Sequence, residues 1–489
     1  MALDKDLVSI QEARDLAVAA REAQQKWAKA SQQEVDRVCS AMAEAAFRAS
    51  ERLGRMANEE TGYGVPLHKK IKNEFGSKGL WESIKDIKTV GVVNHDPIRK
   101  IYEIAWPMGV IAGLTPSTNP TSTVFTKGIG AVKARDAIVF APHPSAAKCS
   151  LEAARVLDEA AVGQGAPAGL ISCMQNISLP GTQELMRHKY VALILATGGS
   201  DMVKAAHSVG KPAYGVGPGN VPVYVDRSAD LEKAARYITY SKAFDYSTIC
   251  ATEQAVFADR PIAQRLAALM QENGAYFTDS AQTNLLRKIL FHPDGTINAA
   301  TVGKSPQYLA GMAGFDVPDT ARILVTRLSE IGKGEPLSRE KLTTVLGWYD
   351  VDGWEDGCER SIELIQFGGR GHSLAIHATD EDVIMAFGME KPVFRITVNT
   401  MSSLGAVGYT TGVMPSMTLG PGGIGGAITG DNVTVHHLFN VKRLAYETTP
   451  PPAAAFSHEN SLKVSPREIE RIVREVVDEI MKQEHLSSS

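Results

Sequence analysis

A cysteine near the middle of the chain lies in a context that permits covalent chemistry. Cys250 stands in FDYSTICATEQ, a run of small and hydroxyl residues that follows an apolar helical pattern. A thiol attacks as its thiolate, so a catalytic cysteine needs nearby hydrogen-bond donors or backbone dipoles. A loop between two domains can supply such free N–H groups. The same residue types also fit a small buried side chain, so Cys250 alone does not decide between catalysis and packing.

Three loops contain groups that could act together with such a thiol. GLTPSTNPTS at 113–122 carries Asn119, whose amide can donate to the oxyanion formed when a thiolate attacks a carbonyl, although a turn asparagine is the alternative. ATGGSDMVKAA at 196–206 reads as a strand, a glycine-rich turn and a helix, and the N–H groups at such a helix start bind phosphate. GVGPGN at 215–220 is a second glycine-rich loop, and neither loop matches the GxGxxG pattern.

Two single ionisable residues complete the set. Glu340 stands in EKLTTVL at 340–346, and His372 stands in GRGHSLAIHA at 369–378. A lone glutamate is usually solvated and a lone histidine often structural, so neither is a site by itself. The chain has 5 cysteines, widely scattered and without a CxxC pair, so we predict neither a metal site nor a disulfide framework.

Alternating strands and helices are the elements that must position these residues. The strand patterns VIAGLT, AIVFAPHP, LISCMQNI, VALILATGG and VPVYVD alternate with helical stretches such as 145–163 and 182–189. A second alternating set begins near 247 and continues to VFRITVN. This alternation predicts an α/β fold with two doubly wound domains, which we assign to 1–245 and 246–430.

Three further segments lie outside these domains. A β-hairpin is predicted over 88–105 and a strand over 431–447. The tail, 448–489, begins with the Pro/Ala linker TTPPPAAAF, which we expect to be extended. It ends in a helix over 465–482 with a capping box and a single apolar stripe. A helix this short has no core of its own, so the stripe either packs on its own chain or binds a partner.

Composition narrows the classes of function. The chain has 489 residues, a formal net charge of −4, 44% hydrophobic and 22% charged residues, which is typical of a globular protein in water. This balance does not favour nucleic acid, and no apolar run approaches the roughly 20 residues that span a bilayer. The polar N-terminus has no secretory signal pattern, and unpaired cysteines suit a reducing compartment. We therefore expect a cytoplasmic protein without nucleic-acid or membrane partners.

Taken together and in this order, these segments resemble the aldehyde dehydrogenase superfamily, and more closely its coenzyme A-acylating branch. The likeness covers about 1–447. It is carried by EKLTTVL, by GRGHSLAIHA, by SKAFDYSTICATEQAV at 241–256 and by GGIGGAITGDNVTVHHLFNVKRLA at 422–445. The resemblance implies an NAD(P)-binding domain, a catalytic thiol domain, and β elements at 88–105 and 431–447 that join subunits into a homodimer or homotetramer.

The resemblance also implies a reaction and a role for each candidate residue. Cys250 attacks a short-chain aldehyde of the acetaldehyde or propionaldehyde class, and a hydride passes to NAD, with NADP as the alternative. Asn119 and the Cys250 backbone N–H stabilise the oxyanion, and coenzyme A then takes the acyl group with the help of His372. Cofactor binding is expected at Thr115, Pro116, Ser117, His143, Thr197, Gly198, Gly199, Ser200, Gly215, Gly217 and, at the nicotinamide ribose, Glu340.

Two departures from the family pattern refine this prediction. Hydrolytic members carry a general-base glutamate in a Glu-Leu-Gly-Gly-Lys motif upstream of the nucleophile, where this chain reads GVGPG with Gly215 at the glutamate position. Without a base to activate water, a thioester persists until a thiol arrives, which favours acyl transfer. Many members also bind the adenosine ribose through a lysine, where this chain has Ala141, so the choice between NAD and NADP stays open with NAD preferred.

The tail adds a further resemblance. Acylating aldehyde dehydrogenases of bacterial microcompartments often end in a linker and a short amphipathic helix, and 448–489 resembles such an encapsulation peptide. This implies a shell protein as partner of the 465–482 helix and the microcompartment lumen as location. The alternatives are an acylating sulfoacetaldehyde dehydrogenase, a non-catalytic shell-binding scaffold, a hydrolytic aldehyde dehydrogenase and γ-glutamyl phosphate reductase-like chemistry. Arg370 and Lys391 lie near the family segments, but the sequence does not place them.

Overall fold

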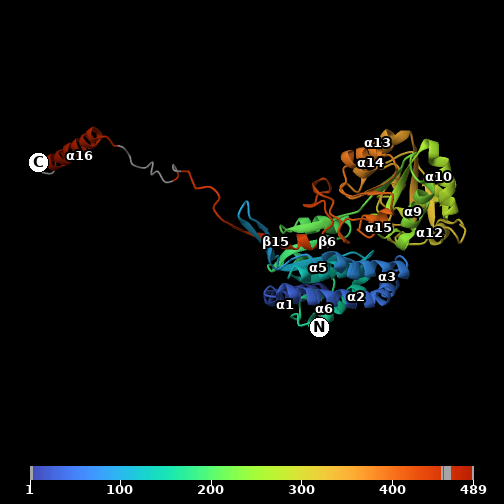
Figure 1. The fold of residues 1–489 in the computed structure, drawn as a ribbon, viewed down its shortest axis with the longest axis horizontal. Helices are drawn as coiled ribbons and strands as arrows, with labels where there is room; N and C mark the ends of the chain where they lie inside the picture. The colour runs from blue at the N-terminus through green and yellow to red at the C-terminus, as the bar shows by residue number, and fades with distance from the viewer. Residues whose placement is uncertain (1–3, 453–454, 456–463, 487–489) are drawn as a thin grey trace. The chain divides into compact units, whose positions relative to one another are not determined.

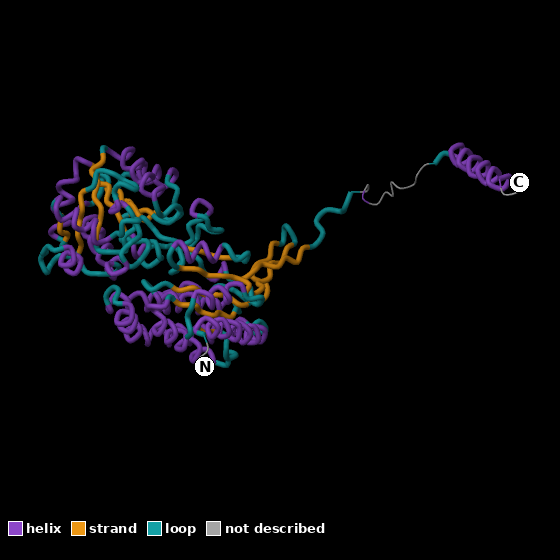
Figure 2. Tube along the Cα trace, turned by 180° about the vertical axis from the view of Figure 1, so that it is seen from behind, coloured by secondary structure: helices purple, strands orange, loops and turns teal. Residues whose placement is uncertain are grey.

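The chain folds into two compact units. The computed structural model describes residues 4–452, 455 and 464–486. The larger unit comprises 1–93 and 103–442, and the smaller comprises 94–102 and 443–489. Within the larger unit, strands form two sheets that are flanked by helices (Figures 1 and 2).

Long helices with alanine-rich buried faces begin the larger unit. They are α1 (Lys5–Trp27) and α2 (Gln32–Thr61), followed by α3 (Pro66–Glu74), a π-helical turn (Phe75–Gly79) and α4 (Leu80–Ile84). The predicted capping box starts α2, because the Ser31 side chain accepts from the Glu34 N–H and the Glu34 carboxylate accepts from the Ser31 N–H. Gly62, at φ 68, ends α2 in the left-handed conformation that glycine adopts without strain.

The first sheet has five parallel strands in the order β5-β4-β3-β6-β7. The strands are β3 (Val110–Thr115), β4 (Ala137–Pro142), β5 (Ile171–Cys173), β6 (Val191–Thr197) and β7 (Ala213–Val216). The connecting helices are α5 (Pro120–Lys133), α6 (Ala147–Gly163), α7 (Leu179–Arg187) and α8 (Ser200–His207). The chain reverses its direction of travel across the sheet between β3 and β6, and ligands of such sheets bind beyond the strands' carboxyl ends at that point.

The second sheet has seven parallel strands in the order β10-β11-β12-β9-β8-β13-β14. Its strands are β8 (Val221–Val225), β9 (Glu253–Asp259), β10 (Ala275–Phe277), β11 (Ile323–Arg327), β12 (Val345–Val351), β13 (Leu374–His377) and β14 (Ile396–Val398). Its helices are α9 (Leu231–Ala243), α10 (Arg260–Glu272), α11 (Ser280–Leu290), α12 (Pro306–Ala313), α13 (Gly353–Phe367), α14 (Glu381–Glu390) and α15 (Ser402–Gly405). The predicted α/β class with two doubly wound sheets is therefore confirmed.

The transition between the two sheets occurs earlier than the sequence suggested. The first sheet ends at Val216, and β8, which starts at Val221, pairs with β9 and β13 of the second sheet. The predicted division between 1–245 and 246–430 therefore falls inside the part of the chain that forms the second sheet. A fully buried parallel strand has the same apolar pattern in either sheet, so its local sequence does not reveal which partners it pairs with.

A third sheet contains the predicted hairpin and strand. Its order is β1-β2-β15, formed by β1 (Gly91–Asp96), β2 (Ile101–Pro107) and β15 (Phe439–Ala445). In the smaller unit, the Tyr446 N–H donates to the Lys100 carbonyl at 3.1 Å. Several large apolar side chains of these segments are exposed, namely Val92, Ile98, Trp106, Val441, Leu444 and Tyr446.

The smaller unit ends in the predicted tail helix. α16 spans Pro466–Leu486, and the Glu468 N–H donates to the Ser465 hydroxyl at 3.2 Å, as the capping pattern predicts. Residues 453–454 and 456–463 of the linker region lie outside the described residues. The predicted stripe is exposed along its length and consists of Ile469, Ile472, Val473, Val476, Val477, Ile480 and Met481. Within the described ranges, no helix combines the length and the apolar character needed to cross a membrane.

Candidate active site

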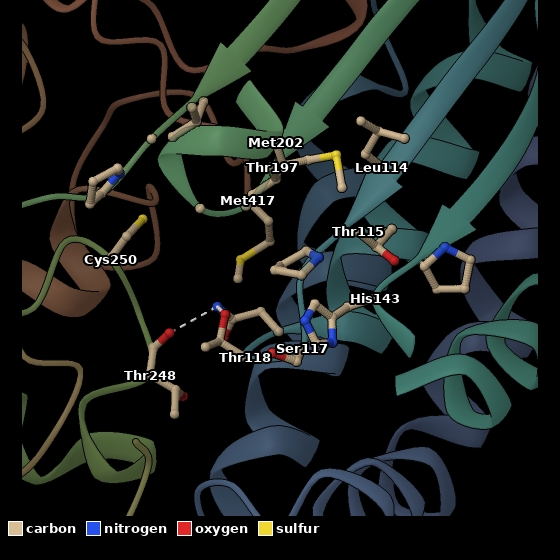
Figure 3. A pocket seen from close by; sticks show the side chains of 18 of the residues that line it. Leu114, Thr115, Ser117, Thr118, His143, Thr197, Met202, Thr248, Cys250 and Met417 are labelled. Atoms are coloured by element: carbon tan, nitrogen blue, oxygen red, sulfur yellow. Dashed lines mark hydrogen bonds between the residues drawn. The ribbon is translucent and has the colours of Figure 1, made fainter. Parts of the chain in front are cut away.

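A pocket of about 460 Å³ opens at the carboxyl ends of the first sheet's strands, against the loop that carries Cys250. Figure 3 shows Cys250 and Thr248 on one side and Thr115, Ser117 and His143 on the other, with Met417 between them. The pocket brings together most of the predicted site residues: Cys250, Asn119, Thr115, Pro116, Ser117, His143, Thr197, Gly198, Gly199, Gly217 and Glu340. These residues come from segments more than two hundred positions apart, so the sheets themselves assemble the site.

Three predicted site residues do not line the pocket. His372 is buried behind Cys250, with its Nε2 3.2 Å from the Cys250 Sγ. Ser200 is the first residue of α8. Gly215 lies in β7, where a Cβ would approach the His207 and Val203 side chains rather than the pocket. At this end of β7 the apolar Val216 lines the pocket. The GVGPG segment therefore contributes no carboxylate to the pocket from position 215 or position 216.

The turn before Cys250 has an unusual backbone. Asp245, Tyr246 and Ser247 have φ values of 48, 50 and 66, which is left-handed backbone that non-glycine residues rarely adopt in succession. Such a conformation persists where surrounding contacts outweigh its cost, and it is concentrated at functional sites. A buried polar network provides these contacts.

Two lysines of α3 anchor this turn. Lys69 Nζ donates to the Asp245 carboxylate at 3.2 Å, and Lys72 Nζ donates to the same carboxylate, to Asn119 Oδ1 and to the Thr248 hydroxyl. We call Lys69, Lys72, Asp245, Thr248 and Asn119 the lysine–aspartate network. Burial disfavours the charge on Asp245, but the two ammonium groups outweigh it and lower its pKa. No local motif marks these lysines, because α3 is distant in sequence from the cysteine loop.

Asn119 belongs to this network. It ends the loop that follows β3 and lies directly before α5. Its Nδ2 donates to the Thr248 carbonyl at 3.0 Å, the dashed line in Figure 3, and to the Thr118 hydroxyl at 3.2 Å. An oxyanion that forms near Cys250 would therefore replace the Thr248 carbonyl or the Thr118 hydroxyl as acceptor of an Asn119 N–H. Lys72 holds the amide oxygen, which fixes the NH2 group as the end that faces the loop.

The charge state of Cys250 reflects opposing influences. Burial raises the pKa of the thiol to about 12, and the Glu340 carboxylate adds to the rise. The guanidinium of Arg395 lowers it, as do the N–H groups of Cys250 and Ala251. Burial and Arg395 together also lower the pKa of His372 to about 3, so this imidazole is neutral at physiological pH. The thiolate therefore depends on the charges that surround the sulfur.

Glu340 is the acidic side chain among the described residues that line the pocket. Its Oε1 accepts from the Gly219 N–H at 2.8 Å. Burial raises its pKa to about 8, against the lowering effect of the Gly219 N–H, Lys242 and Lys341. At neutral pH this carboxyl is mostly protonated, and in that state it does not oppose the thiolate.

The side of the pocket formed by the first sheet fits a dinucleotide. Thr115 Oγ1, at the end of β3, is buried and has no hydrogen-bond partner among the described residues. Gly199 caps α8 without a side-chain hydrogen bond, so the first N–H groups of that helix stay available for a phosphate. No Cβ at Gly199 or Gly217 obstructs the approach of a ligand to the backbone.

Apolar side chains from scattered segments complete the pocket. They are Tyr63, Ile177, Leu179, Met202, Val302, Leu342, Val407, Met417 and Leu419. Their positions carry no local motif, and only their spatial proximity identifies them. Arg370 is exposed and Lys391 contacts Cys358, and neither lines the pocket. All five cysteines are free, and Cys39, Cys149, Cys173 and Cys358 are buried.

Comparison with known proteins relates this geometry to characterised relatives. The profile described as "Aldehyde dehydrogenase family" matches residues 7–278. The curated "Aldehyde-alcohol dehydrogenase 2" of Entamoeba histolytica is 40% identical over 424 residues, which cover 85% of this chain and 49% of that protein. The chain thus spans about half the length of the first curated relatives it matches.

Two solved structures share the fold over most of the chain. An acetylating aldehyde dehydrogenase from Geobacillus thermoglucosidasius is 49% identical with a TM-score of 0.91, covering 92% of this chain and 100% of that one. A propionaldehyde dehydrogenase from the Clostridium phytofermentans fucose utilisation bacterial microcompartment is 29% identical with a TM-score of 0.80, covering 88% and 96%. The resemblance inferred from the sequence is confirmed.

Proposed function

Because the chain belongs to the aldehyde dehydrogenase family, we propose that it is a coenzyme A-acylating aldehyde dehydrogenase. The observation that carries this proposal is the pocket itself. Its lining combines the Cys250 thiol and the Asn119 amide with the strand ends that fit a nicotinamide dinucleotide. Similarity to an acetylating aldehyde dehydrogenase along its whole length supports the acyl-transfer outcome.

The proposed chemistry uses Cys250 as the nucleophile. The thiolate attacks the aldehyde carbon, and the resulting oxyanion receives hydrogen bonds from Asn119 and from the Cys250 N–H. When bound, the nicotinamide cofactor accepts the hydride that leaves this carbon. A thioester on Cys250 remains, and the thiol of coenzyme A takes the acyl group from it.

Protection of the thioester from water favours transfer over hydrolysis. Val216 and Gly217 stand at the strand end that faces the pocket, and neither can activate a water molecule. Glu340 is the acid that remains among the described residues that line the pocket. Its carboxyl is mostly protonated at neutral pH, and its Oε1 accepts from the Gly219 N–H. A thiol from coenzyme A therefore meets an intact acyl-enzyme.

The aldehyde is proposed to be short and uncharged, of the acetaldehyde or propionaldehyde class. Among the described residues that line the pocket, none is a lysine or an arginine, and most of the remainder are apolar. A sulfonate or carboxylate on the substrate would enter this pocket without a cationic partner. This argues against the sulfoacetaldehyde alternative.

The same composition favours NAD over NADP. The 2′-phosphate of NADP normally pairs with an arginine or lysine, and the described residues that line the pocket provide neither. His143 stands near the end of β4, and burial lowers the pKa of its imidazole, so it is not a permanent cation. We therefore propose NAD as the preferred cofactor.

The tail is proposed to bind a microcompartment shell protein and so to direct the enzyme into the lumen. The exposed apolar stripe of α16 and the microcompartment origin of one structural relative support this proposal. Deletion of 457–489 should abolish co-sedimentation with shells and leave activity intact. Ile472→Glu should act like the deletion, and Glu470→Gln on the polar face should not. Entry of the truncated enzyme into shells would refute the proposal.

Homodimers or homotetramers are proposed to form through β1, β2 and β15. Exposed Trp106, Val441 and Leu444 present apolar surface on these strands, as subunit interfaces do. Light scattering on the Leu444→Glu variant tests this: a reduced molecular mass is expected, and an unchanged mass would count against it.

The decisive experiment measures NADH formation with a series of aldehydes, with and without coenzyme A. Strict dependence on coenzyme A and acyl-CoA as product are expected. Turnover to free acid without coenzyme A would contradict acylation. Loss of turnover with every aldehyde would instead support a non-catalytic scaffold.

A further inference from the structure

Arg395, directly before β14, is a buried cation that acts on the Cys250 thiol and that the function proposed above does not use. Its side chain is 5% exposed. Its guanidinium donates to the carbonyls of Gly430 at 2.9 Å, His372 at 2.8 Å and Gly420 at 2.6 Å. In the described part of the chain its hydrogen bonds end on neutral oxygen atoms, and the Asp431 carboxylate acts on the guanidinium through its charge.

The hydrogen bonds that lead from Arg395 to the sulfur have a defined direction. Arg395 Nε lies 3.4 Å from the Ser373 hydroxyl, and a guanidinium only donates. Ser373 Oγ lies 3.0 Å from His372 Nδ1. Ser373 is 1% exposed, and Nδ1 is the acceptor available to its hydrogen among the described residues. A buried hydroxyl hydrogen without an acceptor is avoided in folded proteins, so the hydroxyl donates to Nδ1.

This direction determines the tautomer of His372. A neutral imidazole that accepts at Nδ1 carries its hydrogen on Nε2. Nε2 lies 3.2 Å from the Cys250 Sγ, so this hydrogen points at the sulfur. Gly219 packs so closely on the imidazole that a Cβ would lie 2.9 Å from Nδ1, which holds the ring in place.

We propose that Arg395 and Ser373 are positioning residues that make His372 a hydrogen-bond donor to the Cys250 sulfur rather than a base that removes its proton. Arg395 adds the field of its positive charge, which the Asp431 carboxylate partly offsets, to the same atom. The inference rests on the proposed function for its place in the reaction. The groups that act on Cys250 are His372, Arg395 and Glu340. Asp431 acts on Arg395, and Lys242 and Lys341 act on Glu340.

The relay matters most when the thioester is cleaved. The coenzyme A thiolate forms a bond to the acyl carbon, and the bond from that carbon to Cys250 Sγ breaks. The electron pair of the broken bond stays on Sγ, where the Nε2–H donates to it. No proton is transferred in this step and no atom changes oxidation state. A better stabilised Cys250 thiolate is a better leaving group.

The test follows alkylation of Cys250 by iodoacetamide as a function of pH, with the modified peptide quantified by mass spectrometry. It needs no aldehyde, cofactor or coenzyme A, so it can fail or succeed independently of the dehydrogenase assay. Ser373→Ala should raise the apparent pKa of the reaction by about one pH unit. Without the hydroxyl, Nδ1 can carry the imidazole hydrogen itself, and Nε2 then does not donate to the sulfur. Ser373→Thr keeps the hydroxyl and should restore the original value.

A second pair of variants distinguishes a donor from a base. The amide of His372→Gln reaches the position of Nε2 and donates, but it cannot accept a proton as a base. Its alkylation profile should stay close to that of the parent, whereas His372→Ala should move to higher pH. Equal shifts for the two His372 variants, or equal profiles for the two Ser373 variants, would overturn the proposal.

Discussion

Two buried polar networks flank the Cys250 loop, and they treat their positive charges differently. In the lysine–aspartate network, Lys69 and Lys72 share the Asp245 carboxylate, and burial lowers the pKa of Lys72 to about 7, so charge is nearly balanced within the network above neutral pH. In the Arg395–Ser373–His372 relay, the guanidinium meets neutral oxygens and its field reaches the thiol. A balanced network holds geometry, whereas an unbalanced one can tune a reacting atom.

The largest effect is expected from substitution of Cys250, whose sulfur is the atom on which the relay acts. Cys250→Ala removes the sulfur on which Arg395 and His372 act, so NADH formation and acyl-enzyme should both be lost. The thermal unfolding midpoint should change little, because the network that shapes the loop is intact. Cys173→Ala, a buried cysteine of β5, serves as the control and should retain turnover. Residual turnover in Cys250→Ala would place the nucleophile elsewhere.

Breaking the balanced network should mainly affect stability. Lys72→Met leaves Asp245 with one buried partner, and the loss of one member of a buried ion pair costs about 3–5 kcal/mol of unfolding free energy. Urea denaturation measures this. The matched control is the neighbouring Lys70→Met, whose pair with Glu51 is exposed and should contribute less than about 1 kcal/mol. Equal costs for the two substitutions would mean that the network does not hold the loop.

Asn119 connects the balanced network to the pocket, so its removal tests whether geometry alone supports catalysis. Asn119→Ala should lower kcat by roughly 10²–10³-fold, since one oxyanion donor is lost. The alkylation profile of Cys250 should stay close to that of the parent, which would separate oxyanion binding from thiolate stabilisation. Thr182→Val, at another pocket-lining polar residue without an assigned role, is the control. A normal rate in Asn119→Ala would assign the oxyanion to other donors.

Substitution of Glu340 is expected to give the smallest effect, a change in how the unfolding free energy depends on pH. Burial raises its pKa in the folded state from 4.5 to about 8, so the folded state binds more protons than the unfolded state across this interval. The unfolding free energy should therefore fall as pH rises from 4.5 towards about 8. Glu340→Gln should flatten this fall and shift Cys250 alkylation to lower pH, because the opposing carboxylate is gone. The exposed Glu330→Gln is the control, and an unchanged slope in Glu340→Gln would contradict the assignment.

Local sequence was sufficient for several elements of the fold. The capping box at Ser31, the N-cap hydrogen bond at Ser465, the hairpin of β1 and β2, and the alternation that produced parallel sheets are present as predicted. Each depends on contacts between residues close in the chain or on a periodic burial pattern. The partners of β8 could not be read in this way, because its apolar run suits a central position in either sheet.

The site was predictable to the extent that its residues lie in recognisable segments. Cys250, Asn119 and the strand-end residues from Thr115 to Thr197 do line one pocket. Gly215 was assigned to it and lies outside, because alternate residues of a strand face opposite ways and the neighbour Val216 takes the pocket-facing position. Lys72 and Arg395 were not identified, since a charged residue in a helix or strand usually faces solvent.

The sequence by itself determined the fold class and the family, and it singled out the cysteine that lines the pocket, because these follow from periodicity and from contiguous segments. Only the tertiary structure decided the electrostatics of that thiol. Asp245 meets two lysines of α3, and Arg395 donates to carbonyl oxygens of His372 and of the loops at Gly420 and Gly430, with the Asp431 carboxylate acting on it through its charge. The physical reason is that charge balance in a buried site depends on distances between segments remote in the chain, and these distances exist only once the sheets have packed.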